Sequence, residues 1–126
     1  MRREDWLSDK AIGAAIEVHR ELGPGLLESV YELCLAQELA AQGIAFERQK
    51  VLPVCYKGTA LDSGYRLDFV LEGRVILELK AIDEFAPIHK AQLLTYLKLS
   101  GCKVGLLINF NVPLLKEGIQ RVVHNY

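Results

Sequence analysis

The chain has 126 residues, of which 51% are hydrophobic, and it carries 15 basic and 16 acidic side chains. This composition is typical of a globular protein and excludes an intrinsically disordered chain. The near-neutral charge also excludes nucleic-acid binding through an overall basic charge, so any affinity for phosphate must come from a local patch.

The location of the protein is predicted from its cysteines and its apolar runs. Cys34, Cys55 and Cys102 lack the paired short spacing of a zinc or redox site, which indicates reduced thiols. No stretch approaches the roughly 18 apolar residues of a membrane span, and the first ten residues, MRREDWLSDK, do not resemble a secretory signal. We therefore expect a cytoplasmic protein without membrane contact, folded as one domain over residues 1–126.

Two amphipathic helices are predicted at the start of the chain. Ser8 is a candidate N-cap for the first, whose apolar residues recur with a 3.6-residue period until Gly23 and Pro24. The second helix covers about residues 26–42, and Gly43 supplies its C-terminal cap.

The rest of the chain alternates between strands and one helix. Pro53 places the first of three β-rich runs at a sheet edge or a bulge, and Pro87 suits the first turn of a helix that ends at Gly101. The apolar run that follows predicts a strand covered on both faces, with room for a short last helix. The β-rich runs are IAFERQKVLPVCYKG, YRLDFVL and RVILELKA, and the apolar run is KVGLLINF. This order predicts an α/β sandwich in which a central mixed sheet of about four strands is flanked by helices.

Charged residues stand out in the predicted central strand VILELKA. Alternation sends Ile76, Glu78 and Lys80 to one face, while the other face is apolar. An unpaired charge in such a partly dry place would cost several kcal/mol or be lost through a pKa shift. Glu78 and Lys80 therefore need a charged partner or a metal ion.

Asp68 joins this face only in some registers of the hairpin, because a slip of one residue moves a side chain to the opposite face. A two-residue turn at Glu72 and Gly73 would turn Asp68 away from Glu78. A three-residue loop over residues 71–73, with Gly73 left-handed, makes Asp68 the diagonal neighbour of Glu78. We predict the three-residue loop.

Two carboxylates in this position indicate a metal site. Asp68, Glu78 and the backbone carbonyl of Leu79 offer the hard oxygen ligands that Mg²⁺ or Mn²⁺ prefers. The ammonium group of Lys80 is suited to orienting an attacking water or to stabilising charge on a phosphate. The alternative interpretation is a structural ion network.

Two motifs resemble a known family. Asp68, nine residues and then Glu78-x-Lys80 resembles the signature of the PD-(D/E)XK nuclease superfamily. GLLESVY, residues 25–31, matches the Gly-x-x-Glu-x-x-Tyr pattern of the GxxExxY proteins, a bacterial and archaeal family assigned to that superfamily. The resemblance runs from about residue 8 to residue 122.

A third motif, QLLTY, places Gln92 and Tyr96 at i and i+4 on the third predicted helix, similar to the Gln-x-x-x-Tyr motif of the exonuclease branch. The resemblance implies a restriction-endonuclease-like core in which Glu28 adds a third carboxylate to the metal, while Gln92 and Tyr96 border the site. Glu28 and Glu32 are four residues apart and share a face of the second predicted helix, so one of them can point inward with Tyr31 beside it. Tyr31 is expected to help bind substrate. Arg66 is expected either to neutralise Asp68 or to hold a phosphate.

These features predict a metal-dependent nuclease that hydrolyses phosphodiester bonds in DNA or RNA. Alternatives remain for single residues: Glu28 suits a helix N-terminus through the dipole, and Gln92 and Tyr96 suit an ordinary polar pair. His19 and His89 are expected to be core or surface residues. For the whole protein, the alternatives are a catalytically silent nucleic-acid-binding module and a homo-oligomeric interaction module, since the apolar content is high for so small a chain.

Overall fold

Helices and strands cover most of the chain. The computed structural model describes residues 1–126, apart from the side chain of Ser63. The helices are α1 (Arg3–Leu22), α2 (Glu28–Ala41), α3 (Pro87–Ser100) and the short 3₁₀ helix η1 (Leu115–Gly118). The strands are β1 (Phe46–Tyr56), β2 (Thr59–Leu71), β3 (Val75–Lys80), β4 (Val104–Asn109) and β5 (Ile119–Val123).

The five strands form one mixed sheet in the order β1-β2-β3-β4-β5. Only β3 and β4 are parallel, and α3 connects them. The predicted α/β sandwich is confirmed, with five strands instead of about four. The sequence analysis missed β5 because only one of its residues is buried, which leaves no apolar pattern.

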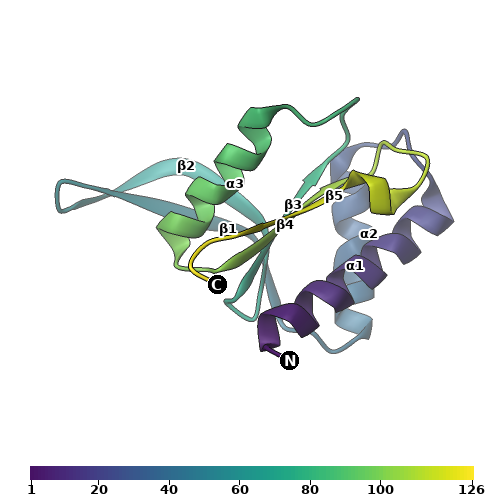
Figure 1. The fold of residues 1–126 in the computed structure, drawn as a ribbon, viewed down its shortest axis with the longest axis horizontal. Helices are drawn as coiled ribbons and strands as arrows, with labels where there is room; N and C mark the ends of the chain where they lie inside the picture. The colour runs from purple at the N-terminus through teal and green to yellow at the C-terminus, as the bar shows by residue number, and fades with distance from the viewer.

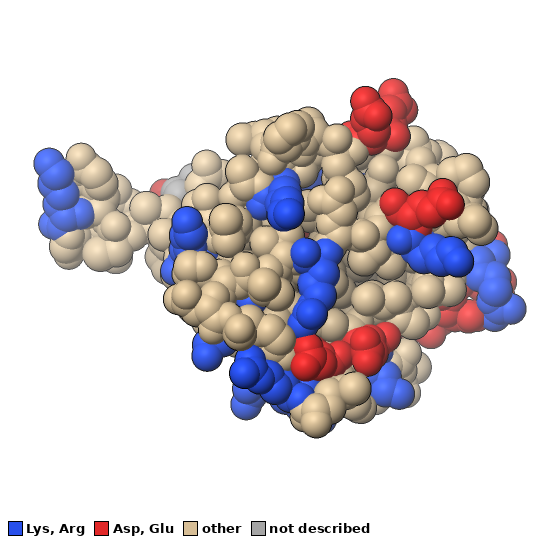
Figure 2. Space-filling view, in the orientation of Figure 1, with Lys and Arg blue, Asp and Glu red and all other residues tan. Residues whose placement is uncertain are grey.

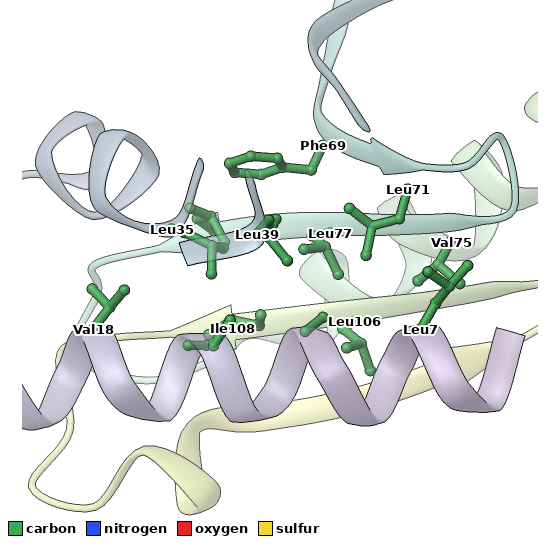
Figure 3. Close-up of a cluster of buried hydrophobic side chains, with 14 of the residues drawn as sticks. Leu7, Val18, Leu35, Leu39, Phe69, Leu71, Val75, Leu77, Leu106 and Ile108 are labelled. Atoms are coloured by element: carbon green, nitrogen blue, oxygen red, sulfur yellow. The ribbon is translucent and has the colours of Figure 1, made fainter. Parts of the chain in front are cut away.

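The sheet lies between two helical layers, with α1 and α2 on one face and α3 on the other (Figure 1). The larger core joins both N-terminal helices to the face of β3 that carries Leu77 and Leu79 (Figure 3). The smaller core joins Leu93 and Leu97 of α3 to the opposite face, which carries Ile76. All six residues of β4 are buried, as its continuous apolar run predicts.

The start of α1 differs from the prediction. Ser8 does not cap this helix, which begins at Arg3. Ser8 is buried, and its hydroxyl donates a hydrogen bond of 2.8 Å to the carbonyl of Glu4 one turn earlier. Leu7 is also fully buried, so the apolar face of the helix extends further toward the N-terminus than the periodicity indicated.

The hairpin between β2 and β3 has a three-residue loop, as predicted, but over different residues. Leu71 pairs with Val75, so the loop consists of residues 72–74 instead of 71–73. Glu72 and Gly73 adopt left-handed φ angles of 50° and 66°. The register is shifted by two residues from the predicted one, which keeps Asp68 on the predicted face but moves it next to Glu78.

The hairpin of β1 and β2 extends well beyond the rest of the sheet (Figure 1). β2 has 13 residues, but only Phe69, Val70 and Leu71 pair with β3. The far end closes at Lys57 and Gly58, which have φ angles of 48° and 83°. The sequence analysis began this strand at Tyr65 because polar residues and glycine precede it.

No helix in the described part of the chain is both long and apolar enough to cross a membrane.

Candidate active site

Asp68 and Glu78 meet where β2 and β3 separate. The β2–β3 ladder ends at Phe69 and Leu77, and the two acids are the next residues on each strand. Glu78 Oε1 accepts a hydrogen bond of 3.3 Å from the backbone N–H of Asp68, and Asp68 Oδ2 accepts one of 2.8 Å from the N–H of Leu79. Side chains thus replace the missing ladder and fix both carboxylates side by side.

The crowding of these two acids changes their protonation. Burial, together with the charge of Asp68, raises the pKa of Glu78 to about 8. Burial also raises the pKa of Asp68, against the hydrogen bond from Leu79. The metal-free pair therefore holds a proton near neutral pH, since two adjacent carboxylates in a dry place do not both ionise.

Lys80 follows on the same face of β3. Its side chain is partly buried, and its positive charge lowers the pKa of both Asp68 and Glu78. Among the described side chains, Lys80 forms no ion pair within 4.0 Å, whereas seven other cations do so. Its ammonium group is thus near the two acids but does not form a salt bridge with either of them.

A residue that no sequence motif marked, Asn109, holds the chain just beyond Lys80. Asn109 pairs with Lys80 across β3 and β4 and is 2% exposed. Its amide group accepts from the N–H of Ile82 at 3.1 Å and donates to the carbonyl of Ile82 at 2.9 Å. These two hydrogen bonds to the backbone of Ile82 fix the turn by which the chain leaves the site.

Of the two α3 residues in the predicted motif, Tyr96 lies close enough to Glu78 and Asp68 for their charges to act on its hydroxyl, and Gln92 is a hydrogen-bond partner of Tyr96. Tyr96 is buried, and the pKa of its hydroxyl rises to about 12 through burial and the nearby charges of Glu78 and Tyr65. A hydrogen bond with Gln92 acts in the opposite direction. The ring of Tyr65 on β2 lies 5.6 Å from that of Tyr96, so an aromatic pair joins α3 to the long hairpin.

A further acidic residue, Glu32 of α2, is linked to Asp68 through the side chain of Gln49. Gln49 on β1 donates from Nε2 to Glu32 Oε1 at 2.5 Å and to Asp68 Oδ1 at 3.2 Å. Gln49 has a left-handed φ of 49°, which is uncommon for a residue other than glycine. Glu32 also pairs with Arg48 at 2.7 Å.

The acidic residue of α2 that the structure links to Asp68 is therefore Glu32, not Glu28. Glu28 is the exposed first residue of α2, and none of the described hydrogen bonds or ion pairs involves its side chain. No three His, Cys, Asp or Glu side chains among those described are grouped closely enough to hold a metal ion. The structure brings together two of the three predicted carboxylate ligands.

Tyr31, expected near the substrate, has no exposed surface. Its ring stacks on Phe110 with 4.3 Å between centroids. Its hydroxyl donates to the carbonyl of Gly23 at 2.6 Å and accepts from the N–H of Leu26 at 3.1 Å. These contacts hold the loop between α1 and α2, which is the physical use of the tyrosine in GLLESVY.

Replacing Tyr31 with phenylalanine is expected to lower the free energy of unfolding by about 1–3 kcal/mol, because two partly buried hydrogen bonds to the loop backbone, each worth about 0.5–1.5 kcal/mol, are lost. Urea denaturation measures this change. Tyr56→Phe is the control, since Tyr56 is 60% exposed. Equal stability of Tyr31→Phe and the wild type would contradict this structural role.

Arg66 does not pair with Asp68. Its guanidinium group lies 3.6 Å from Asp62 and donates to the carbonyl of Tyr65 at 3.0 Å. His19 is buried, with Nε2 at 2.8 Å from the carbonyl of Val112, and His89 accepts from the N–H of Ala86 at the start of α3. Both histidines have structural contacts in the core and at a helix end.

Comparison with families of known proteins matches residues 5–122 to the PD-(D/E)XK nuclease superfamily. The chain belongs to this superfamily. The match runs from the first turn of α1 into β5, and Asp68, Glu78 and Lys80 lie within the matched residues. None of the curated proteins and none of the solved structures matches the chain. The narrower resemblance to the GxxExxY proteins stays a prediction.

Proposed function

We propose that this member of the PD-(D/E)XK superfamily is a metal-dependent nuclease that hydrolyses phosphodiester bonds in DNA or RNA. The observation that carries the proposal is the meeting of Asp68 and Glu78 beside Lys80. Folds alone do not establish an activity, so the proposal rests on these side chains and not on the family match.

The residues present suit a hard divalent cation. Asp68 and Glu78 place two carboxylates side by side without a cation at ion-pair distance among the described residues, and burial is the main cause of the raised pKa of each. Oxygen ligands of this kind suit Mg²⁺ or Mn²⁺, with the carbonyl of Leu79 as a further ligand. A bound ion would polarise a phosphoryl oxygen and acidify a water molecule.

The protein's own residues have separate roles in this proposal. The N–H groups of Asp68 and Leu79 orient the two carboxylates, and Gln49 orients Asp68 from the other side. Lys80 is placed to orient the attacking water or to stabilise charge on the phosphate. Glu28 stays the third carboxylate implied by the resemblance, and Gln92, Tyr96 and Arg66 stay proposed substrate contacts.

Mn²⁺ titration by isothermal calorimetry is expected to show binding to the wild type that is lost in Asp68→Asn, because half of the carboxylate pair is removed. Asp62→Asn, which changes an exposed acid of the same strand, is the control and should bind as the wild type does. The same titration of Glu28→Gln and Glu32→Gln tells which acid of α2 contributes. Unchanged Mn²⁺ binding by Asp68→Asn would contradict the proposed metal site.

A silent nucleic-acid-binding module is the second candidate, and one observation favours it. Glu78 is only 7% exposed, and Tyr96, whose pKa its charge raises, is 6% exposed. A substrate phosphate reaches the buried Glu78 only if the side chains around it move. Nucleic-acid binding without cleavage in either Mg²⁺ or Mn²⁺ would support this second function.

A further inference from the structure

The charges of the helices are divided between the two faces of the sheet. α1 and α2 together carry eight acidic and three basic side chains. On the opposite face, α3 carries Lys90 and Lys98, both exposed, and no acidic residue. The proposed site lies on the α3 face, because Glu78 shares a face of β3 with Ile76, which packs in one cluster with Leu93 and Tyr96 of α3. A polyanion is therefore attracted to α3 and repelled from the other helical layer.

The long hairpin extends from this same face. We call residues 53–64 the arm; they pair only within the hairpin, from Pro53 with Asp62 to Tyr56 with Thr59. At its base, Tyr65 contacts Tyr96 of α3. The arm thus begins next to the proposed site and projects away from the body of the protein, past α3 (Figure 1).

The end of the arm carries a cation and an aromatic ring. Lys57 Nζ lies 5.4 Å from the ring centroid of Tyr56, which is 60% exposed. Lys57 forms no ion pair with any described acid, whereas Asp62, an acid of the arm, lies 3.6 Å from Arg66. Figure 2 shows a basic side chain at the far end of the arm, and acidic and basic side chains together over the body of the protein.

We propose that the arm and α3 bind double-stranded B-form DNA, with the arm in the major groove and Lys90 and Lys98 on the phosphate backbone. This inference rests on the proposed nuclease function and names the form of its substrate. The major groove of B-DNA, about 12 Å wide, admits a two-stranded β-ribbon. The deep, narrow major groove of double-stranded RNA does not.

The alternative binding partner of the arm is a second copy of the chain, since the apolar side chains of Val51 and Leu61 are also exposed. The charges favour DNA. Lys57, Lys90 and Lys98 form no ion pair with the described acids and phosphates would complement them, whereas Asp62, the acid that a second arm would bring, already lies 3.6 Å from Arg66. Two exposed acids, Asp83 and Glu84 in the loop before α3, limit the surface that carries these three lysines.

The test measures fluorescence anisotropy of a labelled 20-base-pair DNA duplex in Ca²⁺ across a series of salt concentrations. Lys57→Gln/Lys90→Gln is expected to bind at least about tenfold more weakly at 150 mM salt, with a slope of log affinity against log salt smaller by about 1, since Lys90 is the phosphate contact removed and each such contact contributes about 0.9. The matched control is Lys10→Gln/Lys116→Gln, on α1 and η1, which should bind as the wild type does.

A second variant removes the arm. Residues 54–61 are replaced by Asn-Gly, which joins the paired residues Pro53 and Asp62 through a two-residue turn. Duplex DNA should lose affinity for this variant, and the wild type should bind the duplex more tightly than single-stranded DNA or duplex RNA of the same sequence. Circular dichroism checks that the shortened chain is folded. If it is not folded, the Lys57→Gln/Lys90→Gln variant decides whether the arm and α3 bind DNA.

Several outcomes would overturn the proposal: equal losses in the test and control variants, tighter binding of single-stranded DNA or RNA, no duplex binding at low salt, or an arm variant that changes only the oligomeric state. The two proposals fail separately. Cleavage that depends on Glu78 but not on the arm rejects the arm alone, and arm-dependent binding without cleavage rejects the nuclease activity alone.

Discussion

Replacing Glu78 with alanine is expected to reduce Mg²⁺- or Mn²⁺-dependent cleavage of DNA or RNA by at least about 100-fold. The substitution removes one of the two carboxylates that meet at the parted strands, and with it the position of any ion that stabilises charge on the reacting phosphate. Lys80→Ala should cause a loss of similar size through the missing ammonium group. A plasmid or labelled-oligonucleotide assay measures both rates.

Glu47→Ala is the matched control for this experiment. Glu47 is an exposed acid whose only described partner is Lys50, at 3.0 Å, so its removal should leave the rate unchanged. Cleavage that persists in both Glu78→Ala and Lys80→Ala would arise from a contaminant or from a different site. In that event the proposed active site is wrong, although the superfamily assignment stands.

The fold was predictable where burial leaves a strong pattern in the sequence. The apolar run of β4 is buried on both faces and was assigned correctly, and α3 lies between the predicted Pro87 and Gly101. β5 and the outer half of β2 were missed because their residues are mostly exposed. A solvent-exposed strand is held by backbone hydrogen bonds, which any sequence without proline can make.

The site was predictable where two residues share one strand or one hairpin. Alternation places Glu78 and Lys80 together, and the register of one short loop brings Asp68 to them. The contact of Gln49 with Asp68 spans 19 residues and depends on a left-handed backbone that no local pattern announces.

The motif around Glu28 shows a different limit of sequence analysis. A motif tells which residues recur together, but not which of them faces the site. In GLLESVY the tyrosine turns inward to hold a loop, while Glu28 stays exposed. Glu32, one helical turn later and outside the motif, is the acid that reaches Asp68 through Gln49.

Glu78→Gln is expected to be more stable than the wild type at pH 8 in the absence of metal, by about 2–4 kcal/mol. Burial raises the pKa of Glu78 from 4.5 to about 8, so the folded protein holds a proton that the unfolded chain has lost. Stability from this group is complete below pH 4.5 and declines as the pH rises through 8. Glutamine cannot ionise and keeps an oxygen that can accept from the N–H of Asp68.

Urea denaturation of both proteins in EDTA, from pH 5 to pH 9, measures the effect. Near pH 5 the two free energies of unfolding should agree within about 1 kcal/mol, because Glu78 is then protonated. Mn²⁺ at pH 8 should stabilise the wild type but not Glu78→Gln, since an ion that binds only the folded state shifts the equilibrium toward it. Parallel pH profiles would mean that Glu78 is ionised in the metal-free protein. If the profiles differ as expected, ionised Glu78 lowers the free energy of unfolding of the metal-free protein, and a divalent cation bound to the same carboxylate restores it. The loss of stability and the proposed metal-dependent chemistry then have one cause.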